Sequence, residues 1–193
     1  QVSIPVHVLI RPRSGDFTYS DAEFDIMLTD IRLCKELGFE GVVSGVLTKN
    51  FTLDVERTRK LRSSAGHLKF TFHRAFDWVI DPLSTLKLLN DLEVDYILSS
   101  GQQKSAPLGI DLLADLMQQN YRVQIMPGSG INAGNVELFK KKGFNVAHLS
   151  GTAMIETLSK APLISMNTSS FLSDDHVAAT QLDKIKAVMN KVK

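Results

Sequence analysis

Hydrophobic and polar positions along the chain alternate between two periodicities. Short apolar runs rich in β-branched residues predict buried strands, whereas apolar residues at three- and four-residue steps predict helices. The predicted strands are 6–10, 41–44, 67–72, 96–98, 123–126 and 147–149. The predicted helices are 20–37, 54–64, 82–92, 110–119 and 133–142, and a last helix follows residues 163–175, which we expect to form a loop.

The regular alternation of strands and helices predicts a parallel sheet covered by helices, because parallel strands require long crossover connections. A doubly wound sheet and a (β/α)8 barrel both satisfy this pattern. The segments after nearly every strand are polar and contain glycine, and in a barrel they would all meet at one rim. In an open sheet only the loops at the switch point would meet. We therefore favour an α/β fold of the TIM (β/α)8 type.

Six strand–helix units are visible, and a closed barrel of this type needs eight. Unpaired buried strand edges would be costly, so we expect either that the first two strands precede Gln1 or that a partner covers the opening. No repeat or low-complexity linker divides the chain. Residues 1–193 are thus expected to form a single, N-terminally incomplete barrel domain.

The composition is that of an ordinary globular domain, with 44% hydrophobic residues and a formal net charge of +1. The small net charge gives no reason to expect a nucleic-acid partner. No apolar run approaches the roughly 20 residues of a membrane helix, so no membrane partner is expected either. Cys34 is the single cysteine, which excludes an intrachain disulfide and favours a reducing, cytoplasmic location.

The sequence K-F-T-F-H-R-A-F-D, residues 69–77, places His73, Arg74 and Asp77 at the end of a predicted strand. An Arg74–Asp77 ion pair that only holds the loop is one interpretation. The other is a catalytic group in which Asp77 orients the imidazole of His73 and raises its basicity. We favour the catalytic interpretation, because the three residues fall at the rim where barrel enzymes place their chemistry.

Further loops at the same rim carry groups suited to an anion. Arg11 and Arg13 flank Pro12, and guanidinium groups recognise carboxylates and phosphates in bidentate fashion. We expect one of the two to face a ligand and the other to pair with the protein, for example with Asp16. The predicted ligand-binding residues are Arg11, Arg13, Ser100, Gly101, Gly128, Ser129, Gly130, Ser150 and Gly151.

The Gly128–Gly130 and Ser150–Gly151 loops are the expected anion site. Glycine permits positive φ and close backbone approach, so N–H groups there can line a concavity for an anion. If two strands precede the chain, these loops follow barrel strands seven and eight, where such barrels commonly hold phosphate.

Metal ligands are sparse. His73 and His148 could form a pair in the barrel lumen, although a buried, hydrogen-bonded structural role is the simpler interpretation of His148. Cys34 lies on the apolar face of its helix and is expected to be inert core.

Three segments, residues 10–20, 71–77 and 126–131, together resemble the copper homeostasis protein CutC family. Their order and spacing extend over nearly the whole chain, and Gly128-Ser129-Gly130 departs mildly from the three glycines usual in the family. The resemblance implies a cytoplasmic TIM barrel, often a homodimer, that takes part in copper homeostasis and binds copper(I). It also places the family's first two strands, with the cysteine proposed to bind copper, before Gln1.

Two functions are thus open, and with them the question of whether the chain is an enzyme. The resemblance implies copper(I) binding or trafficking, with copper as the bound ion. The residues themselves favour a TIM-barrel enzyme that acts on a small phosphorylated or carboxylated substrate, with His73 as acid or base and the Gly128–Gly130 and Ser150–Gly151 loops as anion site.

Overall fold

The computed structural model describes residues 3–160, 162–166 and 174–193, and it contains a curved parallel sheet of five strands. The strands pair in chain order: β1 (His7–Leu9), β2 (Gly41–Ser44), β3 (Lys69–Phe72), β4 (Tyr96–Ser99) and β5 (Gln124–Pro127). The prediction of an α/β fold with a parallel sheet is confirmed.

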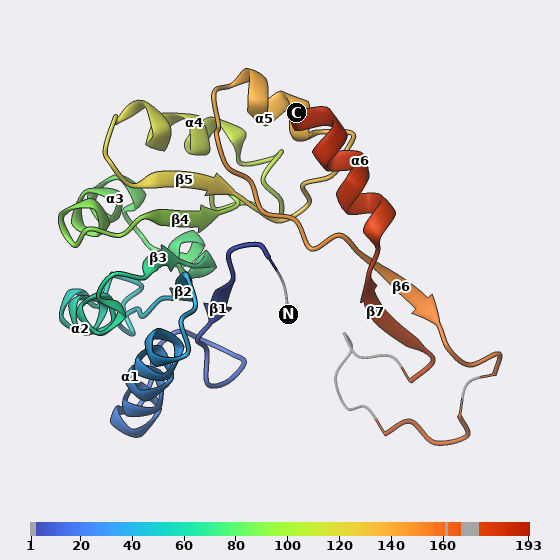
Figure 1. Cartoon of the computed structure of the whole chain (residues 1–193), viewed down its shortest axis with the longest axis horizontal. Helices are drawn as coiled ribbons and strands as arrows, with labels where there is room; N and C mark the ends of the chain where they lie inside the picture. Colours follow the sequence, from blue (N-terminus) through green and yellow to red (C-terminus); the bar gives the residue numbers. More distant parts are fainter. Residues whose placement is uncertain (1–2, 161, 167–173) are drawn as a thin grey trace.

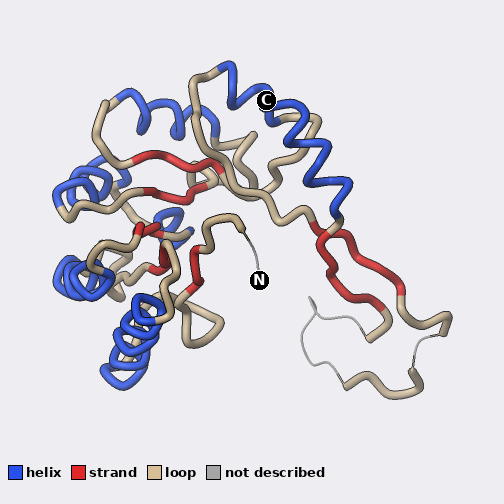
Figure 2. The backbone as a smooth tube through the Cα atoms, viewed as in Figure 1, coloured by secondary structure: helices blue, strands red, loops and turns tan. Residues whose placement is uncertain are grey.

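The connecting helices cover the outer, convex face of this sheet (Figures 1 and 2). They are α1 (Asp21–Glu36), α2 (Val55–Ala65), α3 (Pro82–Asp91) and α4 (Ile110–Gln118), with a short 3₁₀ helix, η1 (Arg74–Trp78), between β3 and α3. Ser20 and Glu23 form a capping box at the start of α1.

The core lies between the sheet and these helices. Phe70 and Phe72 of β3 and Ile97 of β4 point into it and are fully buried. Because successive strand side chains point to opposite faces, Thr71 lies on the concave face together with Leu9 and Val43, its neighbours in register. No helix of the described residues covers this face, and Leu9 is 60% exposed.

The predicted strand at 147–149 is wrong. Among the described residues the parallel sheet ends at β5, and it does not close into a barrel. One ladder-like hydrogen bond continues beyond β5, from the His148 N–H to the Pro127 oxygen at 2.8 Å. Ala147 and His148 are both exposed, so the segment gains too little burial to extend the pairing.

Helix α5 (Val136–Lys141) is shorter than the predicted helix at 133–142. Asn132 accounts for the late start, because its side-chain oxygen accepts the Gly134 N–H and its carbonyl accepts the N–H groups of Asn135 and Val136. The resulting Asx-type turn replaces the first helical turn.

An antiparallel pair of strands, β6 (Thr152–Glu156) and β7 (His176–Thr180), precedes the C-terminal helix α6 (Leu182–Val192). This hairpin extends away from the sheet in Figure 1, and neither strand was predicted. The predicted loop at 163–175 contains no helix or strand in its described residues, and its residues 167–173 lie outside the described part. Every helix of the described residues is too short or too polar to span a bilayer.

Gly101, directly after β4, provides a test of this packing. Its φ is +69°, and a Cβ there would lie 2.1 Å from the Gly109 carbonyl oxygen. We expect Gly101→Ala to lower the free energy of unfolding by about 3 kcal/mol or more, because both the backbone and the contact would have to shift. Urea denaturation monitored by circular dichroism measures this effect.

The matched control is Gly38→Ala. Gly38 has a similar φ of +75°, but a Cβ there would meet nothing within 4 Å. Its cost should be about 1 kcal/mol, the backbone strain alone. Equal losses in the two variants would show that the Gly101–Gly109 contact does not constrain the loop.

Candidate functional site

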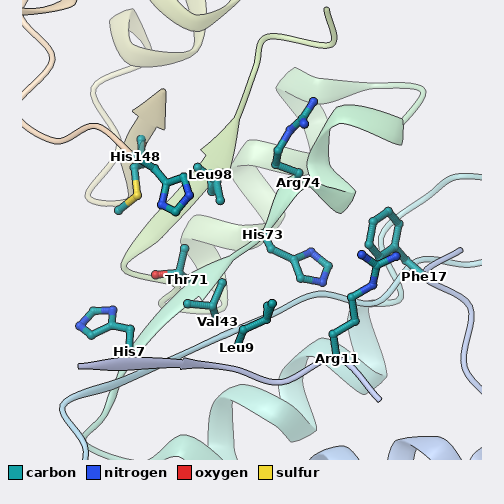
Figure 3. Close-up of a pocket in the computed structure, with 11 residues that line it drawn as sticks. His7, Leu9, Arg11, Phe17, Val43, Thr71, His73, Arg74, Leu98 and His148 are labelled. Carbon is teal, nitrogen blue, oxygen red and sulfur yellow. The ribbon is translucent and has the colours of Figure 1, made fainter. Parts of the chain in front are cut away.

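A cavity of 420 Å³ lies on the open, concave face of the sheet (Figure 3). Strands β1 to β5 and the segments after β1, β3 and α5 all contribute side chains to its wall. The lining residues are His7, Leu9, Arg11, Phe17, Val43, Thr71, His73, Arg74, Leu98, Met126 and His148. Four of the predicted site residues are thereby brought together, namely Arg11, His73, Arg74 and His148.

His73 is fixed at the end of β3 by its own backbone and by the helix that follows. Its N–H continues the ladder to the Ser44 oxygen at 3.0 Å, and its side chain caps η1 by accepting the Ala75 N–H at Nδ1, at 3.2 Å. Because the Ala75 N–H occupies the lone pair of Nδ1, the neutral imidazole carries its proton on Nε2. The ring is 5% exposed and points toward Arg11 and Phe17 (Figure 3).

Two polar atoms of this wall are buried and make no hydrogen bond with any described residue, namely His73 Nε2 and Thr71 Oγ1. Thr71 lies in β3 and His73 directly follows that strand, and both residues line the cavity. Burial, reinforced by the positive charge of Arg11, lowers the pKa of His73 to about 4. At neutral pH the cavity thus presents an uncharged imidazole whose Nε2–H donor is unused.

Arg11 and Phe17 form the wall opposite His73. The guanidinium carbon of Arg11 lies 4.7 Å from the centre of the Phe17 ring, and its Nη2 donates to the Gly15 carbonyl oxygen at 2.6 Å. The Arg11 guanidinium also lies close to the Tyr19 side chain, where its positive charge opposes the rise in the pKa of the phenol that burial causes. Sequence reasoning gave no role to Phe17 or Thr71, although the alternation Phe70-Thr71-Phe72 already places Thr71 opposite the core.

Arg13 pairs with the protein, as expected for one of the two arginines. Its Nε donates to Glu23 at 2.7 Å, and its Nη2 donates to Asp16 at 3.1 Å and to the Thr18 carbonyl oxygen at 2.8 Å. Arg13 does not line the cavity, so its predicted role in ligand binding is not supported by its contacts.

Asp77 organises the loop after β4. Its side chain is 6% exposed and accepts hydrogen bonds from Ser99 Oγ at 2.6 Å, from the Ser100 N–H at 2.9 Å and from the Gln102 N–H at 3.2 Å. Arg74 donates to the same carboxylate at 2.7 Å and to Ser100 Oγ at 2.8 Å. The carboxylate therefore joins η1 to the β4 loop.

The predicted orientation of His73 by Asp77 is wrong, because the backbone of Ala75 holds the imidazole and Asp77 bonds to other groups. In a 3₁₀ helix the side chains at i and i+3 eclipse, so η1 aligns Asp77 with Arg74. Ser100 and Gly101 were predicted to bind a ligand, but neither lines the cavity. Both are buried in the loop that the hydrogen bonds of Asp77 and Ser99 hold in place.

Of the two predicted anion loops, Ser150–Gly151 lines a second cavity of 330 Å³, and Gly128–Gly130 does not. Ser150 and Gly151 line it together with residues 131–134 and with Lys184 of α6, whose Nζ donates to the Thr152 oxygen at 2.6 Å. Gly128, Ser129 and Gly130 are adjacent in sequence, and Ser129 and Gly130 adopt φ values of +75° and +79°. The N–H groups of Ser129 and Gly130 are free of protein acceptors in the described part. The sequence analysis did not predict that Lys184 lines this cavity.

Metal ligands do not gather around either cavity. His7, His73 and His148 come from separate positions along the first wall, and no group of three or more His, Cys, Asp or Glu side chains among the described residues could hold a metal ion. Cys34 is a free, buried cysteine of α1, and burial raises the pKa of its thiol, so it is not poised as a thiolate.

Comparison with known proteins identifies the family. The CutC family model matches residues 1–153. The CutC family protein of Salmonella schwarzengrund (strain CVM19633) is 44% identical over 154 residues, which cover 80% of this chain and 62% of that protein. The corresponding protein of Klebsiella pneumoniae (strain 342) is 45% identical over 149 residues, covering 77% and 60%. The chain belongs to the CutC family, and it spans about three fifths of the length of these relatives.

A solved structure supports the same assignment. CutC of Streptococcus agalactiae, which its name assigns to copper homeostasis, is 34% identical, with a TM-score of 0.72 over 75% of this chain and 72% of that one. The family resemblance drawn from the three sequence segments is confirmed.

The lowered pKa of His73 predicts a pH-dependent stability. Between the unfolded value of 6.5 and the folded value of about 4, the unfolded chain binds more protons, so acidification through this window destabilises the fold. We expect this one group to account for a loss of about 3 kcal/mol on going from above pH 6.5 to pH 4.

His73→Asn should remove this loss, because asparagine can still cap η1 but does not titrate. Urea unfolding at a series of pH values compares the two proteins, with the exposed His67→Asn as control. If wild type and His73→Asn lose stability in parallel, the imidazole is not held neutral by the fold.

Proposed function

We propose that the first cavity binds a small anionic ligand, phosphorylated or carboxylated, and that His73 donates a hydrogen bond from Nε2 to one of its oxygens. The observation that carries this proposal is the pair of unused, buried polar atoms, His73 Nε2 and Thr71 Oγ1, on one wall. A buried donor without an acceptor costs folding free energy, so an arrangement with two such groups facing one cavity favours a ligand that satisfies them.

Charge supports an anion as that ligand. The Arg11 guanidinium lines the cavity, and Arg74, with a side chain that is 44% exposed, lines it from the other side of His73 (Figure 3). Arg74 is paired with the Asp77 carboxylate, whereas Arg11 forms no ion pair with a described residue, and no described carboxylate lines the cavity. The remaining wall is largely aliphatic, with Leu9, Val43 and Leu98, which lowers the local dielectric and strengthens a pairing between guanidinium and anion.

In a reaction, the neutral imidazole would act as an electrophile. A fixed Nε2–H beside a guanidinium stabilises negative charge that develops on a substrate oxygen. A folded-state pKa of about 4 leaves His73 uncharged and weakly basic at neutral pH, so this proposal replaces the acid or base role with that of a hydrogen-bond donor. The Gly128–Gly130 and Ser150–Gly151 loops are proposed as a separate anion-binding region, with Ser150 and Gly151 at the second cavity.

Arg11→Gln tests the proposal directly. We expect the affinity for methyl phosphate or acetate, measured by isothermal titration calorimetry, to fall roughly tenfold or more, because the charge-assisted hydrogen bonds are lost. The matched control is Arg32→Gln, an exposed arginine of α1 that makes the same change of charge. Equal affinities in wild type and Arg11→Gln would contradict an anion site at this cavity.

Copper(I) binding is a second candidate, favoured by family membership and by the name of the Streptococcus agalactiae relative. Soft thiolate ligands select copper(I), and the one cysteine of the chain is buried in α1. Among the described residues, His148 is the exposed imidazole at the first cavity and thus the better placed of the two predicted ligands.

Titration of copper(I) against a competing chelator separates the two candidates. We expect wild type, His148→Ala and Cys34→Ser to bind with the same affinity, because the described residues contain no group of three donors. A loss of about tenfold or more in His148→Ala would contradict this expectation and support a copper site at the cavity.

We further propose a cytoplasmic homodimer. Family resemblance supports both properties, and a free, reduced cysteine fits a reducing compartment. Light scattering on the purified chain measures the oligomeric state.

A further inference from the structure

A groove of 280 Å³ lies beside the first cavity, and no function proposed above uses it. Residues 16–18, residues 47–49, Phe51 and Trp78 line it. Phe51 and Trp78 are 50% and 46% exposed, unusually open for large aromatic side chains outside the core. Their rings meet edge to face, with centroids 6.2 Å apart. They therefore form a corner whose two walls are aromatic rings.

The backbone holds Phe51 in this exposed position. Its φ is +56°, in the left-handed region that non-glycine residues rarely adopt. The turn is fixed by hydrogen bonds from the Phe51 N–H to the Thr48 oxygen at 3.1 Å and from the Thr48 N–H to the Thr52 oxygen at 2.9 Å. The Phe51 oxygen also accepts the Ile80 N–H, two residues beyond Trp78, at 3.1 Å. This hydrogen bond fixes the position of the Phe51 turn relative to residues 78–80.

Phe17 is the wall that the groove shares with the first cavity. Its ring lies 4.9 Å from the centroid of His73 and 4.9 Å from that of Trp78, while the Arg11 guanidinium stacks on it at 4.7 Å. One aromatic ring therefore separates the imidazole and guanidinium of the cavity from the open aromatic corner of the groove.

We propose that the groove holds an aromatic ring of the same ligand whose anionic group binds at Arg11 and His73. Aromatic rings prefer edge-to-face and offset contacts, which the Phe51–Trp78 corner supplies. The volume lies just below the range of about 300–1,000 Å³ that is typical of sites for small molecules, so it suits a ring rather than a segment of protein. This inference rests on the proposed function, and it narrows the ligand to an aryl-substituted anion.

The experiment compares 3-phenylpropyl phosphate with propyl phosphate, which has the same charge and chain but no ring. Calorimetry gives the two affinities, and the emission of Trp78, the single tryptophan of the chain, reports contact with the ring. We expect the aryl phosphate to bind roughly tenfold more tightly, from the apolar area it buries, and to change the Trp78 emission. Propyl phosphate should leave the emission unchanged.

Phe51→Asn removes the ring of the groove and keeps a residue that tolerates positive φ, so the turn should still form. In this variant the two phosphates should bind with equal affinity. Leu108→Ala, a change at another exposed apolar residue, should preserve the difference.

The outcomes separate this inference from the function on which it rests. If both phosphates bind to wild type equally well, the groove is not part of the ligand site, and the anion site stands. If neither binds, the anion site fails and the single-ligand inference is overturned with it. A preference for the aryl phosphate that persists in Phe51→Asn also overturns it, because the ring then binds elsewhere.

Discussion

The carboxylate of Asp77 is the constraint on which the candidate site depends. It lies almost fully buried between η1 and the loop after β4, where it accepts hydrogen bonds from Ser99 and Ser100 and pairs with Arg74. These contacts fix the first turn after β3, and that turn supplies the N–H that holds His73. Asp77 thus acts on the imidazole through the backbone, as a positioning residue that does not touch the ring.

One face of the sheet forms the hydrophobic core, and the other face forms the candidate site. Phe70, Phe72 and Ile97 bury one face under the helices and supply the hydrophobic core. The cavity on the opposite side is lined by Thr71 and His73, whose Oγ1 and Nε2 atoms form no hydrogen bond with any described residue. Natural proteins retain buried polar atoms without partners mainly at functional sites, where hydrogen bonds to a ligand offset the loss of folding free energy.

The sequence predicted the parallel α/β core well, because buried β-branched strands and capped helices are local patterns. It also brought Arg11, His73 and Arg74 to one place, since parallel strands end at a common edge. The partner of His73 was not predictable, because it depends on the backbone of a 3₁₀ helix that periodicity does not reveal. The strand at 147–149 failed for a related reason: an apolar run forms a strand only if a neighbour and a core cover it, and here both Ala147 and His148 remain exposed.

The hydrogen bond from the Ala75 N–H to His73 Nδ1 affects whether His73 can bind a metal ion. A metal ion can bind an imidazole nitrogen only through a lone pair, and the Ala75 N–H already uses the one on Nδ1. Coordination at Nε2 would transfer its hydrogen to Nδ1, where two N–H groups would then point at each other. The tautomer that the capped turn fixes therefore disfavours metal coordination by His73, and the hydrogen bond from the Ala75 N–H would have to break before His73 could serve as a metal ligand.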